Sequence, residues 1–389
     1  MRILIFAAFF EPFKGGYVNS VKELALRLKN NGQEVVIITA NTHHSPAQEI
    51  IDGIEIRRLN CWNPQLLNQS YPLIKPDFWT LKVYRNIVKE RWDIISTQTR
   101  FFPTSLLGLI LAKKKKVPLV HTERGSCHPQ VNSRILALIG RFIDHTLGAV
   151  VINSSQKAVA VSEAGCEFLR HLGNKEPLKI FNGIDTKFFS PASQTAGRDR
   201  LNLKKEDLII TFVGRLIFAK GVQDLIMAFQ PLAEEFPILR LLIVGDGPFR
   251  QNLQRQASEL ALGEKIQFVG EKNKSEIRGI LSASDIFVNP SYSEGLPTSV
   301  LEAAAMGLAI VATDVGGTAE IIEHQKNGLL IPAHRPDLLK KNLSELLKNL
   351  SLRQLFQKNA RATVIQKFNW DKIAQQYLGL FKKYAKNIA

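Results

Sequence analysis

Short apolar runs alternate along the chain with segments of helical periodicity, and glycines stand at many of the junctions. Continuous apolar runs are typical of strands that are covered on both faces of a parallel sheet. In the first half they predict strands at 2–6, 35–39, 54–58, 94–97, 117–121, 149–152 and 178–181. A helix is expected from about Ser20 to Lys29, because Ser20 and Glu23 have capping-box spacing and Gly32 follows.

The same pattern begins again after a polar stretch. Residues 186–205 are rich in Ser, Pro, Gly and charge, which indicates a linker followed by a short helix. Further strands are predicted at 208–213, 239–244, 266–269, 286–289, 309–313 and 328–331, with a helix from about Val222. Parallel strands joined by helices form doubly wound sheets, so the sequence predicts two α/β domains in tandem.

Composition and charge narrow the possible partners. The 389 residues suffice for two domains, and 45% hydrophobic with 22% charged residues argues against disorder. Lys plus Arg exceeds Asp plus Glu by 51 − 35 = 16, which indicates an anionic partner: nucleic acid, an acidic membrane or a phosphorylated small molecule. Cys61, Cys127 and Cys166 are too few and too scattered for a disulfide framework or a cysteine-based zinc site, and they fit a reducing cytosol. Carboxylates and histidines are not clustered as metal ligands, so no metal site is expected.

Neither a leader peptide nor a membrane span is predicted. Residues 1–8 are apolar but are followed by no small-residue cleavage site, and they resemble a buried first strand. No run of about 20 apolar residues is evident, and the nearest is 101–112, which ends in four lysines. The segment from Phe101 to Lys116 is either a peripheral contact with an anionic membrane or a buried helix with a solvated charged end.

Chemistry is expected where strands end, because open parallel sheets bind ligands beyond the carboxyl ends of their strands. Gly15 and Gly16 follow the first strand and precede a helix, where backbone amides can approach an anion; the alternative is a flexible turn. His121 ends another strand and could contact a substrate or act as an acid or base, although a lone histidine is more often structural.

In the second half, Arg215 and Lys220 stand five residues apart in a glycine-flanked loop after the 208–213 strand. An arginine that forks two oxygens and a lysine that acts as a point charge suit a diphosphate, whereas the alternative is a solvated loop with incidental charge. Gly245-Asp246-Gly247-Pro248 is most simply a tight turn.

Glu294 and Glu302 flank a predicted helix start after the 286–289 strand. Exposed amides at residues 296–299 can hold phosphate, and the carboxylates can accept hydrogen bonds from sugar hydroxyls. Ser299 and Glu302 also have capping-box spacing, so Glu302 could instead cap its helix. The chain contains no HExxH, CxxC, GxSxG or GxxxxGK[ST] motif, which leaves zinc hydrolase, α/β-hydrolase and P-loop functions unsupported.

Taken together, these motifs resemble those of the family 4 retaining glycosyltransferases. The resemblance is carried by residues 294–322, 213–221 and 245–248, and by the 12–16 loop, His121, 182–185 and 368–371. It implies the GT-B fold, in which two Rossmann-like domains face each other across a cleft. The implied domains are an acceptor-binding domain at 1–187, a donor-binding domain at 188–369, and a last helix at about 370–389 that crosses back to the first domain.

The resemblance also implies roles for individual residues. Arg215 and Lys220 would grip the diphosphate of a nucleoside diphosphate sugar, Glu294 would hold the transferred sugar, and Glu302 would hold the ribose. Catalysis would involve Arg215, Lys220, Glu294 and His121, with no metal and no further cofactor. Many relatives have Gly or Asp directly after the histidine, whereas here Gly125 is four residues on, which leaves the role of His121 open. The remaining donor contacts would come from Gly15, Gly16, Gly295, Leu296, Pro297 and Thr298.

The activity that the resemblance implies is transfer of a hexose to an acceptor hydroxyl with retained anomeric configuration, in polysaccharide or glycolipid synthesis. The expected partners are the nucleotide-sugar donor and a saccharide or lipid-linked acceptor, and the expected location is the cytoplasm or the inner membrane face. A nucleotide-sugar epimerase of similar fold is the alternative. A nucleic-acid-binding protein is a weaker one, because aromatics are not interleaved with the basic runs. The sequence carries no readable code for the nucleobase, the sugar, the acceptor or the oligomeric state.

Overall fold

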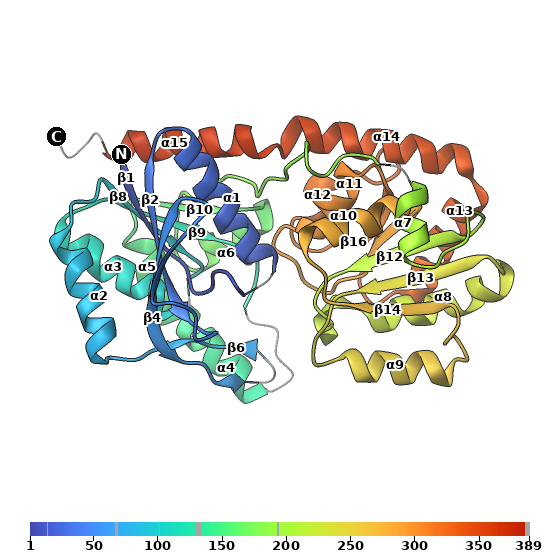
Figure 1. The fold of residues 1–389 in the computed structure, drawn as a ribbon, viewed down its shortest axis with the longest axis horizontal. Coiled ribbons are helices and arrows are strands. Elements are labelled where there is room, and N and C mark those ends of the chain that lie inside the picture. The colour runs from blue at the N-terminus through green and yellow to red at the C-terminus, as the bar shows by residue number, and fades with distance from the viewer. Residues whose placement is uncertain (14, 67–68, 101, 129–133, 193, 386–389) are drawn as a thin grey trace. The chain divides into compact units, whose positions relative to one another are not determined.

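The computed structural model describes residues 1–385 except 14, 67–68, 101, 129–133 and 193. The chain forms two compact units (Figure 1): unit 1 is Met1–Asn182 with the segment that begins at Trp370, and unit 2 is Gly183–Asn369. The boundary falls five residues before the predicted one at 187. The reason is local pairing, because the Ile184 amide donates to the Phe368 carbonyl at 2.7 Å and Ile184 forms a parallel bridge with Asn369.

Unit 1 is built on a nine-stranded sheet with the order β11-β10-β9-β8-β1-β2-β4-β3, and β7 pairs with β4. All of these pairings are parallel except β3 with β4 and β4 with β7. A separate antiparallel pair joins β5 to β6. The strands are β1 Arg2–Phe6, β2 Glu34–Asn41, β3 Gln48–Ile51, β4 Ile54–Trp62, β5 Gln65–Leu66, β6 Gln69–Ser70, β7 Leu73–Ile74, β8 Ile94–Gln98, β9 Leu119–Glu123, β10 Lys157–Ala160 and β11 Leu178–Lys179.

Helices cover both faces of this sheet, which explains why residues 3–6 of β1 and 35–38 of β2 are apolar on both faces. Ile3 and Ile5 of β1 pack in one core with α1 and α15, and Leu4 and Phe6 pack in a second core with α2 and α3. The helical segments of unit 1 are α1 Gly16–Asn30, α2 Phe78–Lys89, α3 Pro103–Lys115, α4 Arg134–Ile143, a π-helical turn Asp144–Gly148, α5 Ala149–Asn153, α6 Glu163–His171 and α15 Trp370–Ala385.

The last helix, α15, belongs to unit 1 although it follows unit 2 in the chain. Trp370, Tyr377 and Phe381 are buried in the same core as α1. Asp371 adds an ion pair with Arg27 of α1 at 2.9 Å. Residues 386–389 of the predicted crossover helix lie outside the described residues.

Unit 2 has a six-stranded, fully parallel sheet with the order β14-β13-β12-β15-β16-β17. When the six strands are numbered from the start of unit 2, their order in the sheet is 3-2-1-4-5-6, which is the strand order of dinucleotide-binding folds. The strands β4-β2-β1-β8-β9-β10 of unit 1 have the same order. The strand order therefore reverses between β12 and β15, and between β1 and β8. The strands are β12 Leu208–Val213, β13 Leu239–Val244, β14 Ile266–Gly270, β15 Ile286–Asn289, β16 Ala309–Thr313 and β17 Leu329–Ile331.

The helices of unit 2 connect these strands and cover them. They are α7 Gln194–Arg200, a 3₁₀ turn Phe218–Lys220, α8 Val222–Glu235, α9 Arg250–Glu259, α10 Lys274–Ala283, α11 Thr298–Ala305, α12 Thr318–Ile321, α13 Pro336–Lys348 and α14 Leu350–Lys367. Helices α8 and α13 bury Phe229, Leu232 and Leu343 against the sheet. Each unit thus has its own core and its own switch point in strand order.

Two local predictions are wrong. The run 149–152 is helix α5, because it continues the helical segment that begins at Arg134, and a short β-branched run has no period that separates helix from strand. The strand expected at 149–152 begins a few residues later, as β10. Helix α1 begins at Gly16, so Ser20 lies inside it and its hydroxyl donates to the Gly16 carbonyl at 2.8 Å.

The apolar segment that ends in four lysines is a core helix. Leu109, Leu111 and Ala112 of α3 are buried, whereas Lys113 and Lys114 are exposed. This arrangement matches the alternative of a buried helix with a solvated charged end; Phe101, the first residue of the predicted membrane contact, lies outside the described residues.

A different segment of unit 1 presents apolar side chains to solvent. Ile135, Leu138, Ile139 and Phe142 of α4 are 70, 65, 48 and 70% exposed, and their spacing puts them on one helix face. Within the described residues, one helical segment, Ile135–Asn153, is long and apolar enough by length and composition to cross a membrane. The prediction that 101–112 is the nearest to such a run is therefore wrong.

Candidate functional site

The loop after β12 carries Arg215 and Lys220 and lies where the strand order of unit 2 reverses. Neighbouring loops fix its backbone: the Leu216 amide donates to the Asp246 carbonyl at 2.9 Å, and the Tyr292 amide donates to the Ala219 carbonyl at 2.8 Å. In parallel sheets such a switch point opens a crevice for ligands. The loop therefore presents both cations on a rigid backbone at the position that the fold favours for binding.

Glycines allow these loops to lie against one another. Gly221 has φ +64°, and a Cβ there would lie 1.9 Å from the Pro290 carbonyl oxygen. Gly245 has φ +130°, and its Cβ would lie 1.9 Å from the Gly214 carbonyl oxygen. Only glycine fits either position, so the predicted tight turn at 245–248 also supports the loop that carries Arg215.

Lys220 and Glu294 form an ion pair between the loops after β12 and β15. Lys220 Nζ lies 2.6 Å from Glu294 Oε1, and the Ser291 hydroxyl donates to the same oxygen at 2.7 Å. The Glu294 side chain is 9% exposed and that of Lys220 is 23% exposed, whereas Arg215 is exposed. Sequence reasoning found the two charged residues but not the serine, since a single hydroxyl in a polar loop carries no signal.

Helix α11 begins directly after this ion pair. Its N-cap residue is Pro297, and no side chain caps its first turn, so the amides that open the helix point out with partial positive charge. Gly295 and Thr298 flank this start, and Leu296 beside them is buried. The capping-box alternative for Glu302 is wrong, because α11 starts at Thr298 and Glu302 lies a full turn inside it.

Glu302 is buried on α11. Burial raises the pKa of its carboxyl from 4.5 to about 7, and the nearby Lys274 ammonium offsets only part of this rise. A buried carboxyl without a strong cationic partner is costly to ionise, and carboxyls with strongly shifted pKa values cluster at binding and active sites.

Gly15, Gly16 and His121 belong to unit 1. Gly15 has φ +141° and is the N-cap of α1, and no side chain caps the amides that begin with Gly16. His121 is fully buried on β9, where Nδ1 shares a hydrogen bond with the Thr97 hydroxyl at 2.9 Å. Its Nε2 has no hydrogen-bond partner and lies 3.7 Å from Glu123 Oε2. The remaining predicted residues, from Arg215 to Glu302, all belong to unit 2.

A buried charge network in unit 1 escaped the sequence analysis. Arg100 pairs with Glu123 at 2.9 Å and with Asp144 at 2.9 Å, and all three side chains are 0–1% exposed. Burial alone would raise the pKa of Glu123, but the Arg100 guanidinium, His121 and the Gly125 amide hold it at about 2. The three residues lie far apart in the chain, so only the fold reveals them as partners.

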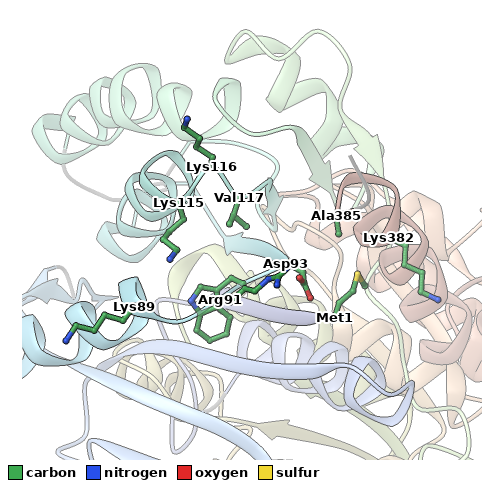
Figure 2. A pocket seen from close by; sticks show the side chains of 10 residues that line it. Met1, Lys89, Arg91, Asp93, Lys115, Lys116, Val117, Lys382 and Ala385 are labelled. Atoms are coloured by element: carbon green, nitrogen blue, oxygen red, sulfur yellow. The ribbon is translucent and has the colours of Figure 1, made fainter. Parts of the chain in front are cut away.

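Unit 1 also contains a basic cavity of about 790 Å³ (Figure 2), lined by Lys89, Arg91, Lys115, Lys116 and Lys382 with Asp93 as the one carboxylate. It lies where β8 and β9 begin, at the edge of the sheet opposite to their carboxyl ends. It is therefore separate from the predicted site.

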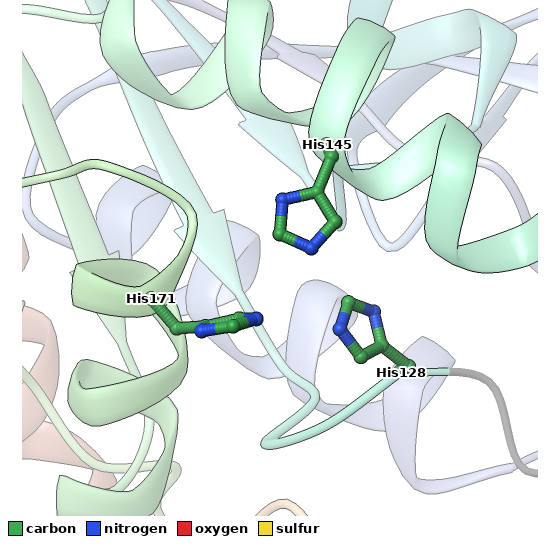
Figure 3. A group of neighbouring side chains, drawn as sticks. All are labelled: His128, His145 and His171. Atoms are coloured by element: carbon green, nitrogen blue, oxygen red, sulfur yellow. The ribbon is translucent and has the colours of Figure 1, made fainter.

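The expectation that histidines are not clustered is wrong in one place, since His128, His145 and His171 gather in unit 1 (Figure 3).

Comparison with known proteins shows the family and the fold. Residues 14–188 match the model of the glycosyltransferase family 4, and residues 193–363 match that of the glycosyl transferases group 1. The chain is a family 4 glycosyltransferase. Its two Rossmann-like units, one with a mainly parallel sheet and one with a fully parallel sheet, are those of the GT-B fold.

Among its relatives, this glycosyltransferase is 28% identical to an uncharacterised glycosyltransferase of Methanocaldococcus jannaschii, with 98% of each chain covered. It is also 28% identical to the N,N'-diacetylbacillosaminyl-diphospho-undecaprenol alpha-1,3-N-acetylgalactosaminyltransferase of Campylobacter jejuni. That match covers 93% of this chain and 94% of the relative. The solved structure of Anabaena HepE in complex with UDP-glucose has the same fold, with a TM-score of 0.77 at 19% identity over 98% of this chain and 100% of the other.

Proposed function

We propose that this glycosyltransferase moves a hexose from a nucleoside diphosphate sugar to an acceptor hydroxyl with retention of anomeric configuration. The observation that carries the proposal is the Lys220–Glu294 pair at the switch point of the unit 2 sheet, with Arg215 in the same loop as Lys220. The pair brings a cation that can bind a diphosphate next to a carboxylate that can accept hydrogen bonds from sugar hydroxyls. The complex of HepE with UDP-glucose supports a donor of this class.

The difficult step of such a transfer is the departure of the diphosphate from the anomeric carbon. In the proposal, Arg215, Lys220 and the uncapped amides of α11 stabilise the negative charge that develops on the leaving group. Glu294 holds Lys220 in place and accepts hydrogen bonds from the sugar, with Gly295, Leu296, Pro297 and Thr298 shaping the pocket around sugar and phosphate. No metal is assigned to this step, because fixed positive groups supply the neutralisation.

Glu302 is proposed to hold the ribose hydroxyls. Its buried carboxyl would exchange an unfavourable environment for two hydroxyl donors when the nucleotide binds. Binding would therefore lower the pKa of Glu302 and release a proton near pH 7.

Retention needs the acceptor to attack the face from which the diphosphate leaves, unless a covalent intermediate forms. No side chain is assigned as a covalent nucleophile, so we propose front-face attack in which the leaving phosphate accepts the proton of the acceptor hydroxyl. Gly15 and Gly16 are proposed to approach that phosphate. His121 is proposed to lie near the reacting sugar, although its burial requires neighbouring side chains to move first.

We further propose that the acceptor is lipid-linked or a growing polysaccharide and that the enzyme works at the cytoplasmic face of a membrane. The name of the Campylobacter relative gives it a diphospho-undecaprenol acceptor. In this chain the exposed face of Leu138, Ile139 and Phe142 on α4 is suited to lie in a lipid interface, and the net charge of +16 favours anionic lipid. The proposed membrane contact thus moves from residues 101–116 to α4.

Activity tests the donor site. A thermal-shift screen of UDP-, GDP- and ADP-sugars identifies the donor, because a ligand that binds the native state raises the melting temperature. With that donor, Arg215→Ala and Lys220→Ala should each lower kcat by about 10²–10³ with unchanged melting temperature, whereas Lys341→Ala, on the exposed side of α13, should not. Near-native turnover by both variants contradicts the assignment, and epimerised donor in the absence of acceptor favours the epimerase.

Vesicle binding tests the membrane contact. Wild-type protein should sediment with vesicles that contain anionic lipid, and Leu138→Ser with Phe142→Ser should abolish most of this binding. Ile50→Ser is the matched control, since Ile50 is 74% exposed on β3. Equal binding by the double variant, or no binding by the wild type at any salt concentration, contradicts the proposal.

A further inference from the structure

Three histidines from three segments of unit 1 converge on one point. His128 follows β9, His145 lies in the π-helical turn, and His171 is the last residue of α6. One nitrogen from each ring lies within 4.8 Å of the other two. Figure 3 shows the three rings turned toward a shared space. All three belong to the described residues, and none belongs to the proposed donor site.

A hydrogen bond to Asp144 fixes the orientation of the His128 ring. Its Nδ1 lies 2.7 Å from Asp144 Oδ2, and Asp144 is itself held by Arg100 at 2.9 and 3.0 Å. When Nδ1 donates its N–H to this buried carboxylate, the lone pair of Nε2 is left for another partner. A carboxylate behind the ring is the usual support of a histidine that binds a metal, because it sets the tautomer and raises the basicity of the other nitrogen.

The other two rings are free to adjust. His145 and His171 are exposed, and the ring centroids of the three histidines lie 5.1–5.6 Å apart. Zinc binds imidazole nitrogen at about 2.0–2.1 Å, which puts the ligand atoms of a tetrahedral site about 3.3 Å apart. The ligand atoms of the cluster lie within 4.8 Å of one another, so each would move inward by about 1 Å to reach that spacing.

Charge also favours a cation at this place. Three protonated rings at this separation would repel one another and any metal ion. Three neutral rings carry no charge that would repel a metal ion, and each offers a nitrogen lone pair to it. A set of imidazoles without acidic ligands suits zinc and its neighbours among the transition metals and does not suit magnesium or calcium, which prefer oxygen.

We propose that His128, His145 and His171 bind one Zn²⁺ ion, with water or a further ligand in the fourth position. The ion would join the helical segment 134–153 to α6 and to the loop after β9. Because His145 lies in the segment that exposes Ile139 and Phe142, zinc would hold that apolar helix against unit 1.

Metal titration tests the proposal. After treatment with a chelator, the full chain should bind one Zn²⁺ per molecule in isothermal titration calorimetry, and Zn²⁺ but not Mg²⁺ should raise the melting temperature. Co²⁺ at the site should give the visible absorption of tetrahedral coordination. His145→Asn and His171→Asn should each weaken Zn²⁺ binding at least tenfold, whereas His44→Asn, a change at an exposed histidine outside the cluster, should not.

Two further results keep the test decisive. Without metal, the His145→Asn and His171→Asn variants should have the melting temperature of the wild type, since both side chains are exposed. With zinc, hydrogen exchange should slow in 134–153 and α6 of the wild type alone. The proposal is overturned if Zn²⁺ does not bind saturably, or if His145→Asn and His171→Asn bind it as tightly as the control.

Discussion

Lys220 Nζ lies 2.6 Å from Glu294 Oε1, although 74 residues separate the two positions in the chain. The pair joins the loop after β12 to the loop after β15, so each residue both occupies the candidate site and holds the other in place. If the proposed function holds, a substitution at either position removes a contact with the donor and also the orientation of the other residue.

We expect the two residues to act as a unit in catalysis. Lys220→Met and Glu294→Gln should each lower kcat/KM by about 10² or more, and the double variant should lose much less than the product of the single effects, because interacting residues are not additive. Steady-state kinetics of the three variants measures this coupling. If the single effects multiply, the ion pair does not organise the site.

The close approach of Gly221 to Pro290 predicts a steric effect. Gly221→Ala would put a Cβ 1.9 Å from a carbonyl oxygen at φ +64°, so the free energy of unfolding of unit 2 should fall by about 2 kcal/mol or more. Urea denaturation measures the change. Gly263→Ala is the control, because nothing lies within 4 Å of a Cβ there; equal effects of the two changes would show that loop packing is not responsible.

Glu302 should make stability depend on pH. Its pKa is raised from 4.5 to about 7, so the folded chain keeps a proton that the unfolded chain loses over this window. The free energy of unfolding should therefore fall as pH rises from 4.5 to 7, by up to about 3 kcal/mol. Glu302→Gln should remove this decline and be more stable than wild type at pH 8, whereas Glu345→Gln, at an exposed position, should change nothing.

The same residue predicts proton release on donor binding. Calorimetry near pH 7 in buffers of different ionisation enthalpy should show protons leaving when the nucleotide sugar binds to the wild type. Glu302→Gln should bind without this release. A proton count that is the same in both proteins would mean that Glu302 does not contact the donor.

The Arg100–Glu123–Asp144 network predicts a large loss of stability. Arg100→Leu would leave two buried carboxylates without their cation and should lower the free energy of unfolding by about 3–5 kcal/mol. The pKa of Glu123 is lowered to about 2, so the stability that it contributes is present above pH 4.5 and is lost as pH falls toward 2. Chemical denaturation at pH 7 and pH 3 measures both effects. Arg170→Leu, in an exposed pair with Glu163, should cost little.

The sequence by itself determined the two Rossmann-like domains and most of their strands, because apolar runs bounded by glycine turns are local features with a fixed period. It also singled out Arg215, Lys220, Glu294 and Glu302, since the ends of consecutive parallel strands meet at one edge of a sheet. It misjudged residues 149–152, where four apolar residues are too few to show a period.

Only the tertiary structure decided which distant residues became partners. The burial of Arg100 with Asp144, the gathering of His128, His145 and His171, and the exposure of the α4 face all depend on where a segment lies against the sheet. Hydrophobic pattern says that a helix has an apolar face, but whether that face meets a core or solvent is set by contacts between segments far apart in the chain. That difference explains why a polybasic helix proved to be part of the core and why the exposed apolar helix went unnoticed.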